Sequence, residues 1–285
     1  SAIQLFQIID QATFIHVMGW ISKYSKSELL VQFAYFSANP NKITMILIAV
    51  ATSIGGVGIP LLTENYVKGD FRSAARLVQD NLSMLIFFIL PATIGAVLVA
   101  EPLYTVFYGK PDGLAQGLFI FAMLQTIILS LYTVLAPMIQ ALFQNRKAII
   151  YFLYGVGVKL VLQVPLIYIF KAYGPLLATT VGLIIPILLM YQEIRKVTGL
   201  NPKNLFKRSL LSVILTVLMC IFVLVAELLI GLFLHPSGRI SSFVYIALIG
   251  GIGLAVYGGL ALKVRLMDRF IGSKAASLRR RFHIY

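Results

Sequence analysis

The sequence predicts an all-α, polytopic membrane protein with eight transmembrane helices. Of its 285 residues, 59% are hydrophobic and only 12% are charged, which is too little charge to cover the surface of a soluble domain of this size. The mean hydropathy is +0.91. Apolar runs of about 20 residues recur along the whole chain, and a hydrocarbon core roughly 30 Å thick requires runs of that length.

The predicted spans follow these apolar runs in order. They cover residues 2–20, 43–62, 82–100, 115–137, 148–170, 174–193, 209–233 and 242–262. Between the first two spans, the stretch SELLVQFAYF at 27–36 is apolar but too short to cross a membrane. We therefore expect an interfacial helix or a re-entrant segment there.

Proline distinguishes the earlier predicted spans from the last two. Pro91, Pro137, Pro165 and Pro186 lie inside predicted helices, where neighbouring helices or water can satisfy the freed backbone groups and where bending is available for alternating access. The last two spans contain no proline, and the final one is rich in glycine. This difference predicts a mobile set of six helices followed by a closely packed pair.

The net charge of +14 comes from lysine and arginine residues that cluster in loops on one side of the membrane. Most of them fall in the loops after the second, fourth and sixth spans and in the tail after residue 262. By the positive-inside rule this side is cytoplasmic, which places the C-terminus inside the cell and requires no nucleic-acid partner. The alternate loops hold only Lys23, Lys26, Lys42, Lys110, Lys171 and Arg239.

The sequence carries no signature of an enzyme, a cofactor site or a metal site. Its three histidines are scattered, and it has no paired-carboxylate loop, nucleotide-binding loop or metal-ligand spacing. The single cysteine, Cys220, lies inside an apolar run, so no intrachain disulfide can form. No cleavable signal peptide is recognisable, and the chain begins with Ser1 and not methionine, so we expect the later part of a longer protein.

Lys159 lies near the middle of the run RKAIIYFLYGVGVKLVLQVPLIYIF, too deep for its ammonium to reach the interface easily. A lysine at the bilayer centre costs about 2.5–3.5 kcal/mol, so it needs an anionic partner or an aqueous cavity. Gln163, four residues on, shares its helix face. We expect either a cation that meets an anionic substrate or an ion pair with a carboxylate on another helix, most plausibly Asp10. Both interpretations hold if the substrate displaces the carboxylate from Lys159.

The first predicted helix carries a polar stripe. Gln4, Gln7 and Gln11 fall on one side of it at about 100° per residue, and Asp10 lies beside them. Such a stripe must face a cavity or other helices and not lipid. Interhelical hydrogen bonds, worth about 0.6 kcal/mol each, would account for the glutamines alone, whereas the carboxylate favours an aqueous pathway.

One segment carries a family resemblance. In IAVATSIGGVGIPLLTENYVKGDFRSAARLVQDNLSMLIFFILPATIGAVLVAEPLYTVFYG a glycine-rich helix ends in Ile-Pro, a Lys-Gly-Asp turn follows, and the next helix holds Pro91 and Gly95. This pattern resembles the second lobe of the MOP-superfamily exporters, in particular the Gram-positive branch of MurJ-type lipid II flippases and related polysaccharide exporters. The later stretches APMIQALFQNRKA and YGPLLATTVG are similar in placement to helix ends of that family.

The resemblance implies a fourteen-helix protein in which two six-helix lobes enclose a cationic cavity and a final helix pair borders a groove suited to a polyprenyl tail. This chain would then comprise the second lobe at 1–200, the additional pair at 201–270 and a basic cytoplasmic tail at 271–285. Its implied partners are a lipid-linked glycan precursor, membrane lipids and the first lobe of the same protein, which this chain lacks. Many relatives carry arginine where this chain has ANPNKI, so Lys42 is the candidate to replace it.

The implied activity is the movement of a polyprenyl-pyrophosphate-linked cell-wall precursor across the cytoplasmic membrane by alternating access. Two other functions remain open at this point. An organic-cation exporter of the same superfamily would use acidic cavity residues, which Asp10 favours and Lys159 disfavours. A structural membrane subunit would transport nothing, and removing either residue would change stability but no flux. The candidate pathway residues are Lys159, Gln163, Asp10, Gln4, Gln7, Gln11 and Lys42.

Overall fold

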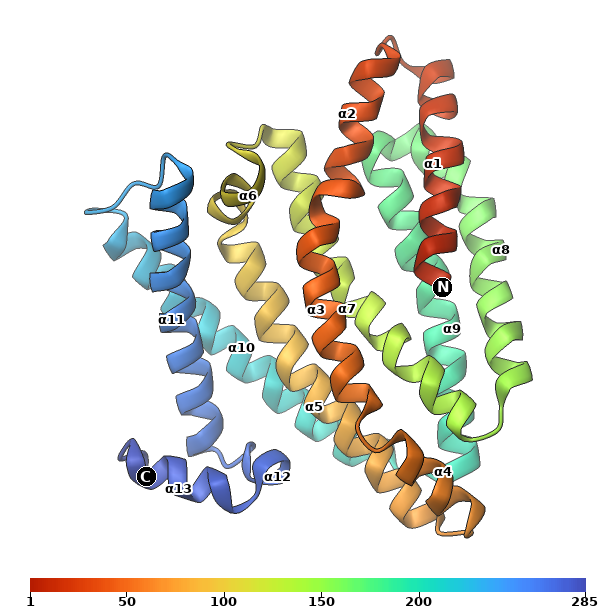
Figure 1. The fold of residues 1–285 in the computed structure, drawn as a ribbon, viewed down its shortest axis with the longest axis vertical. Helices are drawn as coiled ribbons and strands as arrows, with labels where there is room; N and C mark the ends of the chain where they lie inside the picture. The colour runs from red at the N-terminus through yellow and green to blue at the C-terminus, as the bar shows by residue number, and fades with distance from the viewer. The chain divides into compact units, whose positions relative to one another are not determined.

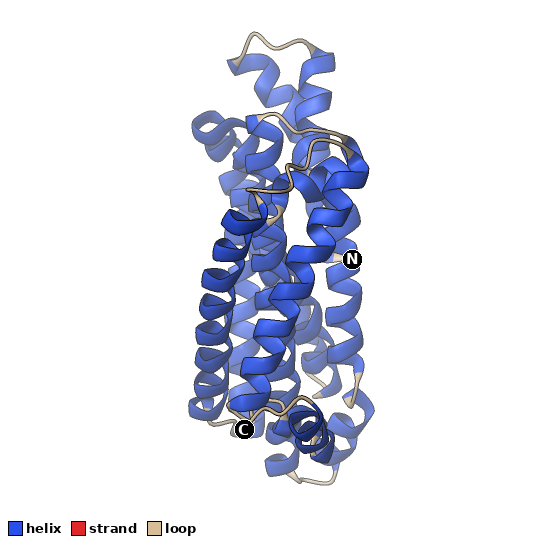
Figure 2. Cartoon of the chain, turned by 90° about the vertical axis from the view of Figure 1, so that its left-hand side faces the viewer, coloured by secondary structure: helices blue, strands red, loops and turns tan.

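The computed structural model describes residues 1–285, apart from the side chain of Arg269. Within that description the chain is helical throughout and contains no strand, which confirms the predicted all-α class (Figure 2). The helices are α1 (Ala2–Ile21), α2 (Lys26–Phe36), α3 (Ala38–Gly56), α4 (Ile59–Val67), α5 (Phe71–Leu98), α6 (Ala100–Tyr108), α7 (Gly113–Ala141), α8 (Asn145–Phe170), the 3-10 turn η1 (Lys171–Tyr173), α9 (Gly174–Thr198), α10 (Pro202–Ile230), α11 (Arg239–Lys263), α12 (Asp268–Ile271) and α13 (Ser273–Arg281).

The helices form two compact units. Unit 1 comprises Ser1–Val78 and Asp112–Leu200, and unit 2 comprises Gln79–Pro111 and Asn201–Tyr285. Helix α5 therefore begins in unit 1 and continues into unit 2. The predicted division into a transport lobe, a helix pair and a tail stays a prediction, because the two units are defined by packing and not by movement.

Unit 1 is organised around α7, against which α2, α3, α4 and α9 pack. Helices α1 and α2 run side by side in opposite directions (Figure 1). Ser25 caps the start of α2, because its hydroxyl accepts a hydrogen bond from the Glu28 amide and the Glu28 carboxylate accepts one from the Ser25 amide. The rings of Phe14 and Phe36 meet edge to face with centroids 5.0 Å apart, and both belong to a buried cluster that includes Leu118 and Leu176.

The structure corrects the interpretation of residues 27–36. This stretch is helix α2, and only Ser37 separates it from α3. Leu29 and Phe36 are buried in the core of unit 1, and residues Lys26–Val67 together form one candidate membrane span. The stretch is therefore the first part of a long, bent spanning segment, and the prediction of a separate interfacial or re-entrant piece is wrong.

A glycine break separates α3 from α4. Gly58 has a φ of 83°, a left-handed conformation that residues with a Cβ rarely adopt, and Pro60 follows in the first turn of α4, where its missing N–H costs nothing. The predicted span at 43–62 therefore ends earlier, at Gly56. Helix α5 likewise begins at Phe71, well before the predicted residue 82.

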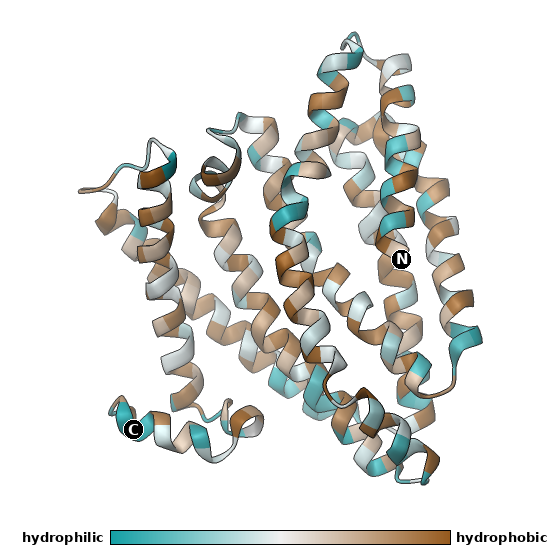
Figure 3. Ribbon diagram, in the orientation of Figure 1, coloured by the Kyte–Doolittle hydropathy of each residue, from teal (hydrophilic) through white to brown (hydrophobic). Residues whose placement is uncertain are grey.

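Six segments of the described chain are long and apolar enough to cross a membrane. They contain seven of the eight predicted spans, because one of them, Asn145–Thr198, holds both α8 and α9. The eighth predicted span, α1, is not among them. Its glutamines and Asp10 lower its hydropathy, and Figure 3 shows polar bands along it, whereas the other long helices are mostly apolar. By this criterion seven of the eight predicted spans are found, and a membrane-spanning role for α1 stays a prediction.

The internal prolines lie where the sequence predicts. Pro91, Pro137, Pro165 and Pro186 are inside α5, α7, α8 and α9, respectively. Neither α10 nor α11 contains an internal proline. The two helices pack against each other in unit 2.

Unit 2 has its own core between α6, α10 and α11. Met219, Val223, Ile249 and Tyr257 are buried together there, and the Tyr257 hydroxyl donates a hydrogen bond to the Phe87 carbonyl at 2.7 Å. After α11 the chain turns, and α13 lies across the end of α11 (Figure 1).

An ion pair fixes this last turn. The Arg279 guanidinium donates to both carboxylate oxygens of Asp268, one of them at 3.1 Å. This interaction holds the pKa of Asp268 below its usual range. The Asp268 carboxylate therefore keeps its charge over the physiological pH range.

Helices α8 and α9 approach closely because glycine lies at their contact. A Cβ built on Gly155 would come within 2.4 Å of the Gly182 carbonyl oxygen, a distance at which backbone must move. Near the other end of the pair, the Lys147 ammonium donates to the Glu193 carboxylate at 2.7 Å.

We expect Gly155→Ala to lower the free energy of unfolding by about 1–3 kcal/mol, the usual cost of overpacking. Gly157→Ala is the matched control, because Gly157 is two residues away on the same helix and nothing lies within 4 Å of its Cβ position. The control should be neutral or slightly stabilising. Denaturant titration of the protein in detergent measures both, and equal effects would contradict the close contact.

Candidate functional site

The site is built around a lysine that is completely buried. Lys159 lies at the middle of α8, and its side chain has no exposed surface. It packs beside Gly182 of α9, whose built Cβ would come within 3.2 Å of the lysine Cβ. The close approach of α8 and α9 therefore leaves room for the lysine side chain but for little else.

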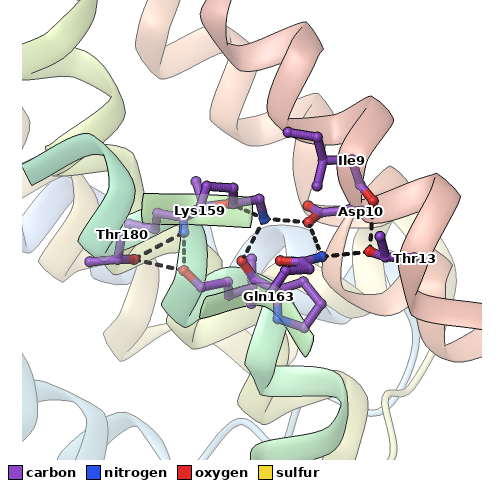
Figure 4. A network of polar contacts seen from close by, with 10 residues as sticks. Ile9, Asp10, Thr13, Lys159, Gln163 and Thr180 are labelled. Carbon is purple, nitrogen blue, oxygen red and sulfur yellow. Dashed lines mark hydrogen bonds and ion pairs between the residues drawn. The ribbon is translucent and has the colours of Figure 1, made fainter. Parts of the chain in front are cut away.

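The ammonium of Lys159 has three hydrogen-bond acceptors, which matches its three N–H donors. It donates to the carboxylate of Asp10 on α1, to the Pro175 carbonyl at 3.1 Å and to the Thr179 hydroxyl at 2.9 Å, the last two on α9 (Figure 4). Each donor is thus satisfied by a different group. The ion pair with Asp10 was one of the two interpretations of Lys159 that the sequence allowed.

Gln163 completes the network from the next turn of α8. Its side-chain amide donates to Asp10 and to the Thr13 hydroxyl, both at 2.9 Å (Figure 4). Its own carbonyl oxygen is buried and has no hydrogen-bond partner. The same Asp10 oxygen accepts from both Lys159 and Gln163, so α1 is fastened to α8 at two points.

A small cavity of about 50 Å³ adjoins this network between α1, α3, α7 and α9, with room for a few water molecules. Asp10 and Thr179 line it, and so does Gln125, whose amide donates to the Leu176 carbonyl at 2.7 Å. Lys159 is not among the lining residues. Of the two charged residues, Asp10 therefore lines the cavity and Lys159 does not.

The remaining predicted residues separate into two sets. Gln7 lines the cavity and donates to the Asn41 side chain of α3 at 3.4 Å. Gln4, Gln11 and Lys42 are exposed and lie outside both the network and the cavity lining. A common role for the glutamine stripe stays a prediction.

Sequence reasoning missed the residues that complete the site. These are Thr179, Gln125 and Asn41. Each is followed by another polar residue, Thr180, Thr126 and Lys42, respectively. Such short polar pairs were the available signal, but polar side chains that pack between helices are common enough in membrane proteins that the signal is weak. Among the described residues, no group of three or more histidine, cysteine, aspartate or glutamate side chains is placed to hold a metal ion.

Unit 2 contains a second and larger cavity of about 430 Å³ between α5, α10 and α11. It is within the size range of small-molecule sites, and its walls are almost entirely apolar. The lining residues are Phe87, Phe88, Pro91, Ala92, Gly95, Val99, Met219, Val223, Ile246, Ile249, Gly250, Gly253, Leu254 and Tyr257.

Comparison with known proteins gives one consistent result. The sequence model of the family "Lipid II flippase MurJ" matches residues 18–247. The chain belongs to the MurJ family. The MurJ protein of Bacillus subtilis (strain 168), a lipid II flippase, is 28% identical over 277 residues, which cover 96% of this chain and 51% of the relative.

A solved structure has the same fold. It is described as "Lipid II flippase MurJ, inward closed conformation", and it matches with a TM-score of 0.64 at 16% identity over 93% of this chain and 51% of that protein. The chain thus spans about half the length of the MurJ proteins that it matches. The family name describes a membrane transporter and not an enzyme, and the apolar spans fit a multi-pass protein of the cytoplasmic membrane.

We expect Lys159→Met to lower the free energy of unfolding by about 3–5 kcal/mol, because it leaves the buried Asp10 carboxylate without its counter-charge. The double variant Lys159→Met/Asp10→Asn removes both charges and should regain part of that loss. Denaturant titration of the two single variants and the double variant gives the coupling energy. Additive effects would contradict a buried ion pair at this position.

Proposed function

We propose that this chain is the C-terminal part of a lipid II flippase, which moves a polyprenyl-pyrophosphate-linked cell-wall precursor across the cytoplasmic membrane by alternating access. Membership of the MurJ family over residues 18–247 is the observation that carries this proposal. Transport would require the first lobe of the same protein, because the matched MurJ proteins are about twice as long. The C-terminus would be cytoplasmic, as the clustering of lysine and arginine favours.

Within this function, we propose that Asp10 and the substrate compete for Lys159. The only anionic partner of Lys159 in the described structure is Asp10, and both are buried. A pyrophosphate would reach the ammonium only after α1 moves and carries the carboxylate away. Gln163, which fastens the same carboxylate to α8, would resist that movement. The ion pair would thus mark one end state of the transport cycle.

The exposed polar residues of unit 1 suit a different role in the same cycle. Gln4, Gln11 and Lys42 lie on the exposed faces of α1 and α3. Polar side chains at membrane depth must face water or protein and not lipid. We therefore infer that the exposed faces of α1 and α3 line the translocation pathway or contact the first lobe. Lys42 would be the cation that α3 contributes to the pathway.

The apolar cavity of unit 2 suits the polyprenyl tail of such a substrate. Its volume of about 430 Å³ would hold several isoprene units. Its phenylalanine, methionine and leucine side chains are apolar, so a bound hydrocarbon would not deprive them of hydrogen-bond partners. Gly250 and Gly253 keep the wall formed by α11 open.

An organic-cation exporter is the second candidate function, because Asp10 and not Lys159 lines the small cavity of unit 1. A cationic substrate would bind Asp10 only by displacing Lys159. The two candidates therefore predict opposite substrates for the same pair of residues, and a transport assay separates them.

The decisive measurement is the exposure of lipid-linked precursor on the outer leaflet of cells that produce the complete protein containing this chain. Lys159→Met/Asp10→Asn buries no unpaired charge and, compared at matched protein levels, should lower precursor exposure at least about tenfold. Normal exposure by this variant would mean that the pair serves only stability. A parent protein that exposes no precursor but exports an organic cation would overturn the flippase proposal itself.

A second variant tests the tail cavity. Gly250→Leu places a branched side chain where the cavity wall is open and should lower precursor exposure several-fold. Gly251→Leu is the matched control, because Gly251 is the next residue on α11, is exposed and does not line the cavity. Equal activity of the two variants would exclude this cavity as the tail site.

A further inference from the structure

An open cleft lies in unit 2 at the end where α10 begins and α11 ends, with a volume of about 380 Å³. The first turns of α10 form one wall, and the turn after α11 forms the other. The cleft is separate from the buried network of unit 1 and shares no lining residue with the apolar cavity. Nothing in the proposed transport mechanism uses it.

Two cations in the cleft are exposed and form no ion pair in the part of the chain that the structure describes. Lys207 on α10 and Arg265 after α11 both line it and are exposed. Arg265 is close enough to Asp268 to lower its pKa, but among the described side chains neither cation forms an ion pair. The N-terminal end of α10 adds the positive end of a 29-residue helix to the same wall.

The other charged residues of the cleft are already neutralised. Asp268 is held by Arg279 through two hydrogen bonds, and its single negative charge is shared between Arg279 and Arg265. Arg208 donates to Asp80 at 2.5 Å. The cleft thus has a surplus of positive charge, as an anion site requires.

The backbone at Arg265 is strained. Arg265 has a φ of 61° at the position after α11, where its amide donates to the Leu262 carbonyl and the next amide donates to the Ala261 carbonyl, both at 3.1 Å. Glycine is the usual residue in this helix-ending geometry, and a side chain there is strained. Glycine at this position would therefore relieve backbone strain.

The cleft is also apolar on its membrane side. Leu211, Val264 and Leu266 line it together with the cations, and α10 and α11 on either side are both candidate membrane spans. The cleft therefore lies where apolar helices end, which is the depth of lipid headgroups in a bilayer. A free phosphate would leave the apolar wall unused, whereas a phospholipid would place its phosphate on the cations and its glycerol and upper acyl carbons on the wall.

We propose that this cleft binds the phosphate of an anionic phospholipid, held by Lys207 and Arg265. The basic helix α13 lies across the same end of α11 and carries Arg280 and Arg281 exposed, as expected for a segment at an anionic membrane surface. The proposal does not depend on which substrate the protein transports.

The test is native mass spectrometry of the complete protein containing this chain, titrated in detergent with phosphatidylglycerol or with phosphatidylcholine of the same acyl chains. Lys207→Gln/Arg265→Gly should weaken phosphatidylglycerol binding about tenfold or more, since each cation near a lipid surface contributes about 1 kcal/mol. Its unfolding temperature should not fall, because glycine takes the backbone conformation of Arg265 without strain. Phosphatidylcholine should bind equally weakly to parent and variant.

The matched control is Lys171→Gly/Arg239→Gln. It also removes two positive charges, and it also places glycine at a residue with positive φ, Lys171 at 55°, but both residues lie outside the cleft. The control should bind phosphatidylglycerol within about twofold of the parent. Unchanged binding by the cleft variant would overturn the proposal. So would displacement of the lipid by inorganic phosphate at equal concentration, since that outcome would assign the cleft to a small anion.

Discussion

The burial of one ammonium group constrains the rest of unit 1. A charge without exposed surface in an apolar helix must be matched by an opposite charge and by hydrogen-bond acceptors for every N–H. Lys159 obtains these from Asp10 on α1 and from Pro175 and Thr179 on α9. A single side chain therefore links α1, which lies far away in the sequence, to the consecutive helices α8 and α9.

That requirement explains features that hydrophobic packing alone would not. Glycine at positions 155 and 182 lets α8 and α9 approach closely enough for the Pro175 carbonyl and the Thr179 hydroxyl to reach the ammonium. Helix α1 must tolerate a carboxylate, which lowers its hydropathy below that of the other long helices. Apolar packing also holds α1 in place, because Phe14, Val17 and Met18 belong to the buried cluster of unit 1, so the ion pair adds to that packing and does not replace it.

The sequence allowed the helical fold, the family and the partnership of Lys159 with Asp10 to be predicted, because membrane length and the cost of buried charge each leave few solutions. It did not allow the exposure of Gln4, Gln11 and Lys42 to be predicted, because helical periodicity shows which residues share a helix face but not what covers that face. The break at Gly58 and the continuity of α2 with α3 were also missed. Both depend on backbone conformation at one residue, which an apolar pattern does not encode.

The order of charges at the site limits how transport could begin. Asp10 lines the small cavity and Lys159 does not, so an anionic substrate that enters from the cavity first meets a like charge. Separating the pair without a replacement would expose the full cost of a buried unpaired ion, about 3–5 kcal/mol. A pyrophosphate carries more negative charge than the carboxylate and could supply that replacement, but only as Asp10 withdraws. Under the proposed function, displacement of α1 and arrival of the substrate would therefore be a single coupled step, in which Asp10 leaves Lys159 only as the substrate takes its place.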